Sequence, residues 1–340
     1  MKLGLGLGYW SAGPPEGIAD LVATAESLGF DSMWSSEAYG SDVLTPLAWL
    51  GSHTRNLKMG TAIAQMSART PAATAMAAMT LDHLSGGRVM LGIGASGPQV
   101  VEGWYGQPYP RPLARTREYV AILRKAMARE KLEYDGEFFQ LPHQGGTGLG
   151  KALRSTIHPL RTDIPILLAA EGPKNVALSA EIADGWLPMF YSPYDDSGYR
   201  QALAEGFARD GARGSLDDFE IPVPVQVDID NDVNAAADRL RPMLALYIGG
   251  MGAKGANFHK AVFDRMGYEE IGDHIQDLYL QGRKEEAMAA IPLEMVEKVA
   301  LIGPKEKIAE EIDTWKNSLI TTMVVSGSQD TLRTMAELVL

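Results

Sequence analysis

Residues 15–35, PEGIADLVATAESLGFDSMWS, contain the unit that decides the fold. Apolar residues recur at helical spacing from Ile18 to Leu28, and Gly29 follows them in the position of a C-terminal cap. Residues 30–35 then form a short, largely apolar run that is typical of a buried strand. A second apolar, Gly-rich run at residues 3–8 precedes the helix, so the order is strand, helix, strand.

The same alternation returns along the rest of the chain. Strands are expected at residues 3–8, 30–35, 58–64, 89–93, 164–169, 186–189, 221–228 and 321–325. Helices are expected at residues 15–28, 44–53, 71–84, 173–183, 199–209, 231–248, 305–318 and 331–340, the sixth with a kink at Pro242. Strands that alternate with helices predict parallel pairing with helical crossovers. In 340 residues, this order favours an α/β fold of the (β/α)8 TIM-barrel type, with a doubly wound sheet as the alternative.

Two stretches interrupt the repeat, and we expect both to be insertions into a single domain that spans residues 1–340. The first lies near residues 134–160, where the alternation around Asp135-Gly136 predicts a hairpin and a Gly-rich loop follows. The second, residues 249–292, begins Gly-rich and then becomes helical. Long insertions of this kind are often lids or binding loops.

The composition limits the function classes. The chain has 31 Lys and Arg against 43 Asp and Glu, a net charge of −12, which disfavours a nucleic-acid binder. It has no Cys, which excludes disulfides and thiolate metal sites, and its six His show no metal-binding spacing, so no metal is expected. No apolar stretch reaches about 18 residues and the start of the chain does not resemble a signal peptide. We therefore expect a cytoplasmic protein without a membrane span.

The C-terminal ends of the strands select the candidate site residues, because TIM-barrel active sites lie there. Glu37 follows the second strand and is the candidate for catalytic proton transfer, with Tyr39 as the second choice. The alternative for Glu37 is a solvated loop acid that caps the helix beginning near Ser41 or Asp42. The residues expected to form the wall of a substrate pocket are Tyr9, Trp10, Met189 and Tyr191.

Two turns of small residues follow the fourth and fifth strands, at residues 94–97 and 170–173. Each offers backbone N–H groups at a place where a ligand can approach closely. Pro173 stands at the first position of the following helix, which leaves the next N–H groups available to an anion. Each turn alone can be an ordinary tight turn, but two on neighbouring strands predict a ligand that carries phosphate.

Several short motifs, in their order along the chain, resemble the luciferase-like monooxygenase superfamily, and within it the deazaflavin (coenzyme F420)-dependent oxidoreductases of actinobacteria. These motifs are GFDSMWSSE (29–37), LKMGTAI (57–63), DHLSGGRVMLGIG (82–94), IPILLAA (164–170) with Gly172-Pro173, ADGW (183–186) and GPKEKI (303–308). The resemblance implies a TIM barrel that binds the deazaflavin in its mouth and transfers a hydride between this cofactor and a small organic substrate.

The resemblance also implies which residues hold coenzyme F420. A non-prolyl cis peptide is expected at Ala62–Ile63, behind the ring, and the turns after the fourth and fifth strands would hold the phosphate tail. The residues expected to bind the cofactor are Ser35, Ala38, Ala62, Ile63, Ala64, Gly94, Ala95, Ser96, Gly97, Gln99, Ala169, Ala170, Glu171, Gly172 and Pro173. The chain departs from many deazaflavin relatives in two places. Glu37-Ala38 replaces an Asp-His pair, and residues 94–98 lack the glutamate of a Gly-Thr-Gly-Glu turn.

Two alternative functions remain open. FMN in place of the deazaflavin would make the chain a monooxygenase, and deazaflavin binding without turnover would make it a carrier or sensor. The expected partners are a small-molecule substrate and further copies of the chain, in a homodimer or higher homo-oligomer. Neither nucleic acid nor a membrane is expected as a partner.

Overall fold

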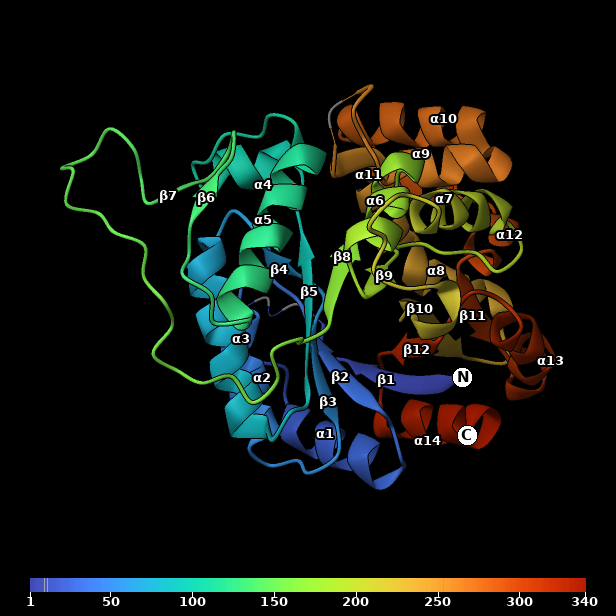
Figure 1. Cartoon of the computed structure of the whole chain (residues 1–340). Coiled ribbons are helices and arrows are strands. Elements are labelled where there is room, and N and C mark those ends of the chain that lie inside the picture. The colour runs from blue at the N-terminus through green and yellow to red at the C-terminus, as the bar shows by residue number, and fades with distance from the viewer. Residues whose placement is uncertain (9, 11, 253) are drawn as a thin grey trace.

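Eight parallel strands form the ring of a barrel in the computed structural model, which describes residues 1–340 except 9, 11 and 253 (Figure 1). The strands of the ring are β1 (Lys2–Gly6), β2 (Ser32–Ser35), β3 (Lys58–Thr61), β5 (Val89–Gly94), β8 (Ile166–Ala169), β9 (Gly185–Leu187), β10 (Pro222–Ile229) and β12 (Thr322–Val325). Pairing is continuous from β9 through β1 to β10. The ring closes where Gly185 of β9 bridges Glu220, just before β10. The expected TIM-barrel fold is confirmed.

Helices follow the strands and cover the outside of the ring (Figure 1). They are α1 (Ile18–Ser27), α2 (Leu44–Gly51), α3 (Pro71–Ser85), α4 (Pro98–Gly103), α5 (Pro112–Met127), α6 (Pro173–Ile182), α7 (Ser197–Phe207), α8 (Val233–Ala245), α13 (Lys305–Lys316) and α14 (Gln329–Val339). Local signals set several ends. Thr70 caps α3 by accepting from the Ala73 N–H, and Gly86 ends it with a left-handed φ of 69°.

Two segments of the chain lie outside the repeat of strands and helices. In the first, β6 (Tyr134–Asp135) and β7 (Gln140–Leu141) pair as an antiparallel hairpin. The second follows α8 and contains the π-helical turn η2 (Leu246–Gly250), α9 (Lys260–Phe263), the π-helical turn η3 (Asp264–Tyr268), α10 (Glu269–Leu280), α11 (Lys284–Ala289) and α12 (Leu293–Glu297). Figure 1 shows α9, α10 and α11 together, above the end of the barrel.

The expected helices did not include α4 and α5, and three short elements were also missed. The short strand β4 (Ala64–Gln65) extends the edge of β3 and pairs with β5. The strand β11 (Ala300–Gly303) pairs with the outer half of β10, and the helical turn η1 (Leu216–Asp218) precedes β10. Each is shorter than five residues, too short to show a period of its own.

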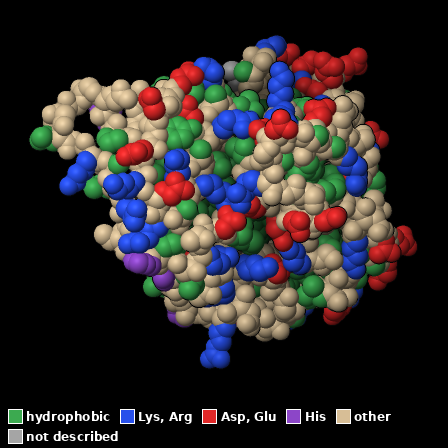
Figure 2. Space-filling view, viewed as in Figure 1, with side chains coloured by type: hydrophobic (Ala, Val, Ile, Leu, Met, Phe, Trp, Pro, Cys, Tyr) green, Lys and Arg blue, Asp and Glu red, His purple; other side chains and the backbone are tan. Residues whose placement is uncertain are grey.

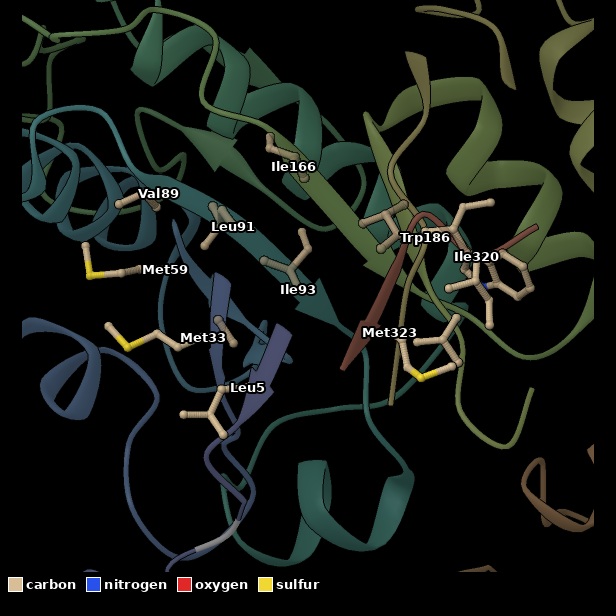
Figure 3. Close-up of a cluster of buried hydrophobic side chains, with 14 of the residues drawn as sticks. Leu5, Met33, Met59, Val89, Leu91, Ile93, Ile166, Trp186, Ile320 and Met323 are labelled. Carbon is tan, nitrogen blue, oxygen red and sulfur yellow. The ribbon is translucent and has the colours of Figure 1, made fainter. Parts of the chain in front are cut away.

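The strands bury two different faces. Outward-facing side chains such as Leu5, Met33, Leu91 and Ile166 pack with helix residues in the main core (Figure 3). The inward-facing side chains form a second cluster, in which Trp34 is the largest. Glycine makes room for this indole, because a Cβ at Gly60 would lie 2.2 Å from the Trp34 ring. These inward-facing side chains therefore fill the interior of the barrel as a packed plug.

Candidate active site

A cavity of about 340 Å³ lies at the C-terminal ends of the strands, a size typical of small-molecule sites. Both small-residue turns reach it, so the structure brings together segments that are far apart in the sequence. The expected residues that line it are Glu37, Ala38, Ala62, Ile63, Gly94, Ala95, Ser96, Ala169, Ala170, Glu171, Gly172 and Met189. Its lower side rests on the barrel plug, against which Ala62, Ile63 and Ala169 pack.

The Ala62–Ile63 peptide is cis, at the expected position. The chain continues from it into β4, whose Ala64 and Gln65 pair with Ile93 and Gly94 of β5. Gly94 must be small here, because a Cβ would lie 2.2 Å from the Ile63 Cδ1. The small side chains at this corner leave a smooth, apolar surface that faces the cavity.

Gly172 and Pro173 begin α6 beside the cavity. Gly172 is the N-cap residue, and a Cβ on it would meet no atom within 4 Å, so the adjacent space is open. On the other turn, Ser96 has a left-handed φ of 58°, and its carbonyl accepts from the Tyr109 hydroxyl. Asn175, in the first turn of α6, also lines the cavity. This rim offers polar groups and a helix N-terminus to an anionic group.

Glu37 is buried, with only 5% of its side chain exposed, and its two carboxylate oxygens accept from Arg69. Arg69 Nη1 donates to Oε2 at 2.8 Å and Nη2 donates to Oε1 at 2.7 Å. The backbone N–H of Gln65 also donates to Oε2, at 2.9 Å. The hydrogen bond to Glu37 raises the pKa of Arg69. These donors occupy both carboxylate oxygens and hold Glu37 as an anchor between the loops after β2 and β3, which argues against the expected role in proton transfer. The capping alternative for Glu37 is wrong, because Asp42 makes those bonds, to the N–H groups of Leu44 and Thr45.

A second carboxylate reaches the cavity beside an imidazole. The Nδ1 atom of His259 lies 2.7 Å from Oε1 of Glu171, and 10% and 9% of the two side chains are exposed. Glu171 follows β8 and His259 comes from the second insertion, immediately before α9. Aromatic rings enclose the imidazole, with the Phe258 and Tyr247 centroids at 4.4 and 4.8 Å.

Two residues expected in the site lie elsewhere. Tyr39 is 60% exposed and packs beside Trp104 on the outer surface, so the structure does not support it as a catalytic residue. Tyr191 is buried in the core, where its hydroxyl bonds to Asp196 and accepts from the Leu319 N–H. Burial raises the pKa of its phenol. The reason is local: Phe190 has a left-handed φ of 54°, so the backbone leaves the extended conformation of the strand before it reaches Tyr191.

The remaining described residues of the expected set are not among those that line the cavity. Gln99 and Pro173 are exposed at helix starts, whereas Ser35 and Ala64 are buried in the strands. Gly97 is the N-cap residue of α4. The carbonyl of Trp10 lies against Gly40. Tyr9 lies outside the described residues.

Sequence reasoning missed several residues that line the cavity. These are Gln65, Tyr109, Asn175, Pro224, Tyr247, Met251, Phe258 and His259. Residues 249–292 were expected to act as a lid or binding loop, and this expectation could have pointed to three of them. Met251, Phe258 and His259 belong to that insertion. His259 carries no motif, because its partner Glu171 lies in a different part of the sequence.

Among the described residues, no cluster of His, Asp and Glu could hold a metal ion. Within the same residues, no helix is long and apolar enough to cross a bilayer.

Comparison with known sequences places the chain in a family. The sequence profile of luciferase-like monooxygenases matches residues 5–322. The chain is also 55% identical, over 343 residues, to a Mycobacterium tuberculosis protein that carries the provisional name coenzyme F420-dependent oxidoreductase Rv3520c. That match covers 100% of this chain and 99% of the relative.

Solved structures share the fold. The F420-dependent tetrahydromethanopterin reductase of Methanopyrus kandleri matches with a TM-score of 0.80 at 23% identity, over 99% of this chain and 97% of that chain. An F420-dependent secondary alcohol dehydrogenase, solved with an F420-acetone adduct, matches with a TM-score of 0.77 at 17% identity, over 99% and 98% of the two chains. The profile match spans nearly the whole barrel, from β1 to the start of β12. The chain therefore belongs to the luciferase-like monooxygenase family.

Proposed function

We propose that this chain is a coenzyme F420-dependent oxidoreductase that transfers a hydride between the deazaflavin and a small organic substrate. The observation that carries the proposal is the cavity, which joins an apolar corner at the Ala62–Ile63 cis peptide to two small-residue turns. The name of the 55% identical relative supports the same cofactor. Bound there, the deazaflavin would supply the carbon that gives or accepts the hydride.

The lining of the cavity fits such a cofactor. Ala62, Ile63 and Ala169 offer a flat, apolar support for a ring system, and the absence of large side chains there leaves room for it. At the rim, Ser96, Asn175 and the open space at Gly172 suit a phosphate-bearing tail. The protein's own contribution would be to orient the two reactants and to exclude water.

Cofactor binding tests the proposal first. Purified protein is titrated separately with oxidised coenzyme F420 and with FMN, and binding is followed by the change in cofactor fluorescence. We expect saturable binding of coenzyme F420 and at least tenfold weaker binding of FMN. The opposite preference, together with oxygen consumption when reduced FMN is supplied, would identify a monooxygenase instead.

Turnover is the second test. Oxidised coenzyme F420 is mixed with a panel of secondary alcohols, and the reduced cofactor with ketones, enones and imines, and the deazaflavin absorbance is followed. Loss of absorbance with an alcohol, or its recovery with an acceptor, is the expected result. Tight binding without turnover of any compound would indicate a carrier or sensor.

We further propose that the protein acts in the cytoplasm as a homodimer or higher homo-oligomer. Exposed apolar side chains on α2 and α3 support self-association: Trp49, Met76 and Leu84 are 49%, 62% and 76% exposed. Nucleic acid is not proposed as a partner, because the net charge is −12 and acidic and basic side chains are interspersed on the face in Figure 2. Light scattering of the purified protein measures the assembly, and a mass of 36.8 kDa would contradict it.

A further inference from the structure

We infer that His259 and Glu171 are the proton-transferring pair of this cavity, with His259 as the group that exchanges the proton and Glu171 as its positioning residue. The inference rests on the proposed function. Both side chains line the cavity, and their Nδ1 and Oε1 atoms are 2.7 Å apart. The pair joins the end of β8 to the insertion after α8, so it forms only when the insertion is seated over the barrel.

The hydrogen bonding of the two carboxylates in the cavity separates their roles. Both oxygens of Glu37 already accept from Arg69. In Glu171, by contrast, Oε2 is buried and has no hydrogen-bond partner among the described residues. A buried carboxylate oxygen without a donor is costly, so it points to a function. Glu171 and His259 are therefore the pair with capacity left for chemistry.

The contact between the pair is close but not fully aligned. At 2.7 Å, Nδ1 and Oε1 are at ion-pair distance, yet the ring N–H is not directed along the line to the oxygen. Protonated Nδ1 beside the carboxylate leaves Nε2 as the nitrogen that can serve a bound substrate. A small rotation of the ring would align the bond, as often happens when a substrate binds.

Charged and titratable groups surround the pair, among them Tyr199, whose hydroxyl accepts from Arg265. Arg265 donates to the backbone carbonyl of Glu171 at 2.7 Å. Lys260, next to His259, is engaged by Asp264 and Asp273 and is therefore neutralised. The Tyr247 ring lies against the imidazole. The Glu171 carboxylate is in direct contact with the ring, so it is positioned to orient the imidazole.

With His259 as the proton acceptor, the atoms and electrons of the proposed reaction balance. When an alcohol becomes a ketone, the C–H hydrogen leaves as a hydride with both bonding electrons, and an oxidised deazaflavin, if bound beside the substrate, would supply the acceptor carbon. The hydroxyl O–H bond breaks, its electrons form the second C–O bond, and the proton passes to Nε2 of His259. In the opposite direction, the imidazolium returns this proton to the carbonyl oxygen as the hydride arrives at carbon. No further oxidant or reductant is needed.

The pairing can be tested without turnover. Nitrogen-15 NMR of the ligand-free protein reports the tautomer of each neutral histidine, and His259→Gln assigns the signal. We expect the Nδ1–H tautomer at His259 in the wild type and in Glu171→Gln, which keeps an acceptor. Glu171→Leu, which has no acceptor, should convert it to the Nε2–H form. An Nε2–H ring in the wild type, or no response to Glu171→Leu, would overturn the pairing.

The catalytic role is tested with the fastest compound of the substrate panel. General acid–base catalysis contributes about 10²–10⁴-fold, so His259→Gln should lower kcat by that factor and remove one ionisation from the pH profile of kcat/KM. The affinity for oxidised coenzyme F420 should change less than threefold. The control is His274→Gln, an exposed histidine of α10 outside the cavity, which should keep wild-type kinetics.

The possible outcomes are distinct. If His259→Gln retains both the wild-type kcat and the wild-type pH profile, the inference fails while the proposed function stands. If wild-type protein binds no coenzyme F420, the proposed function fails, and the tautomer still decides the pairing. If His259→Gln does not fold, as judged by circular dichroism, Glu171→Leu gives the same kinetic test, because misorienting the ring should also reduce kcat at least tenfold.

Discussion

The Glu37–Arg69 pair offers the sharpest test of how the site is supported. In Arg69→Met, Glu37 stays 5% exposed and loses both of its guanidinium bonds, so that only the Gln65 N–H still donates to its carboxylate. Removing one partner of a buried ion pair costs about 3–5 kcal/mol, because an uncompensated charge remains. Two charge-assisted hydrogen bonds at roughly 1.5–3 kcal/mol each give about 3–6 kcal/mol, which overlaps this range. We therefore expect Arg69→Met to lower the free energy of unfolding by about 3–5 kcal/mol.

The assay is urea unfolding followed by tryptophan fluorescence. The second variant, Glu37→Gln, should cost less, about 1–2 kcal/mol, because Arg69 is 22% exposed and can turn towards water. The double variant should be more stable than Arg69→Met alone, since it leaves no buried charge. The matched control is Arg111→Met, which breaks an ion pair with Glu137 whose side chains are 64% and 53% exposed, and should cost at most about 1 kcal/mol. An Arg69→Met effect no larger than that of the control would refute the reasoning.

Three further results are expected. Gly60→Ala places a Cβ 2.2 Å from the Trp34 ring, so it should destabilise the barrel by about 1–3 kcal/mol or more, measured as a fall in the urea midpoint. Gly172→Ala meets no atom within 4 Å, so its stability should be retained while its added methyl group weakens coenzyme F420 binding; unchanged affinity would mean that the ligand does not pass Gly172. The Arg117 hydrogen bond helps to lower the pKa of Glu181 from 4.5 to about 2. This stability is present above pH 4.5 and is lost as the pH falls towards 2, and Arg117→Met should reduce the acid dependence of the thermal midpoint.

The order of the barrel strands is a local property of the sequence. Each unit contains a run of apolar residues at helical spacing and a short strand. Residues close together in the sequence determine both the helix and the strand. The short strands β4 and β11 were not predicted. Their own residues show no strand pattern, and they are strands because they pair with β5 and β10. The turns at residues 94–97 and 170–173 were predictable too. Each directly follows a predicted strand, and in a TIM barrel the C-terminal ends of the strands lie at the mouth.

Pairings across the sequence decided the rest of the site. Tyr191 was predicted to face the pocket because it follows the end of a strand, but the backbone at Phe190 turns it into the core. Nothing near Glu37 in the sequence shows that Arg69 will bind both of its oxygens, and nothing near His259 shows that Glu171 will meet it.

The sequence by itself determined the alternation of strands and helices, the small-residue turns and the family, because each depends on residues that are adjacent or regularly spaced. Only the tertiary structure decided which carboxylate is held by a guanidinium and which one faces an imidazole. The physical reason is that a side chain's charge and hydrogen bonding depend on neighbours in space, and the closing of the barrel and the seating of the insertion select those neighbours.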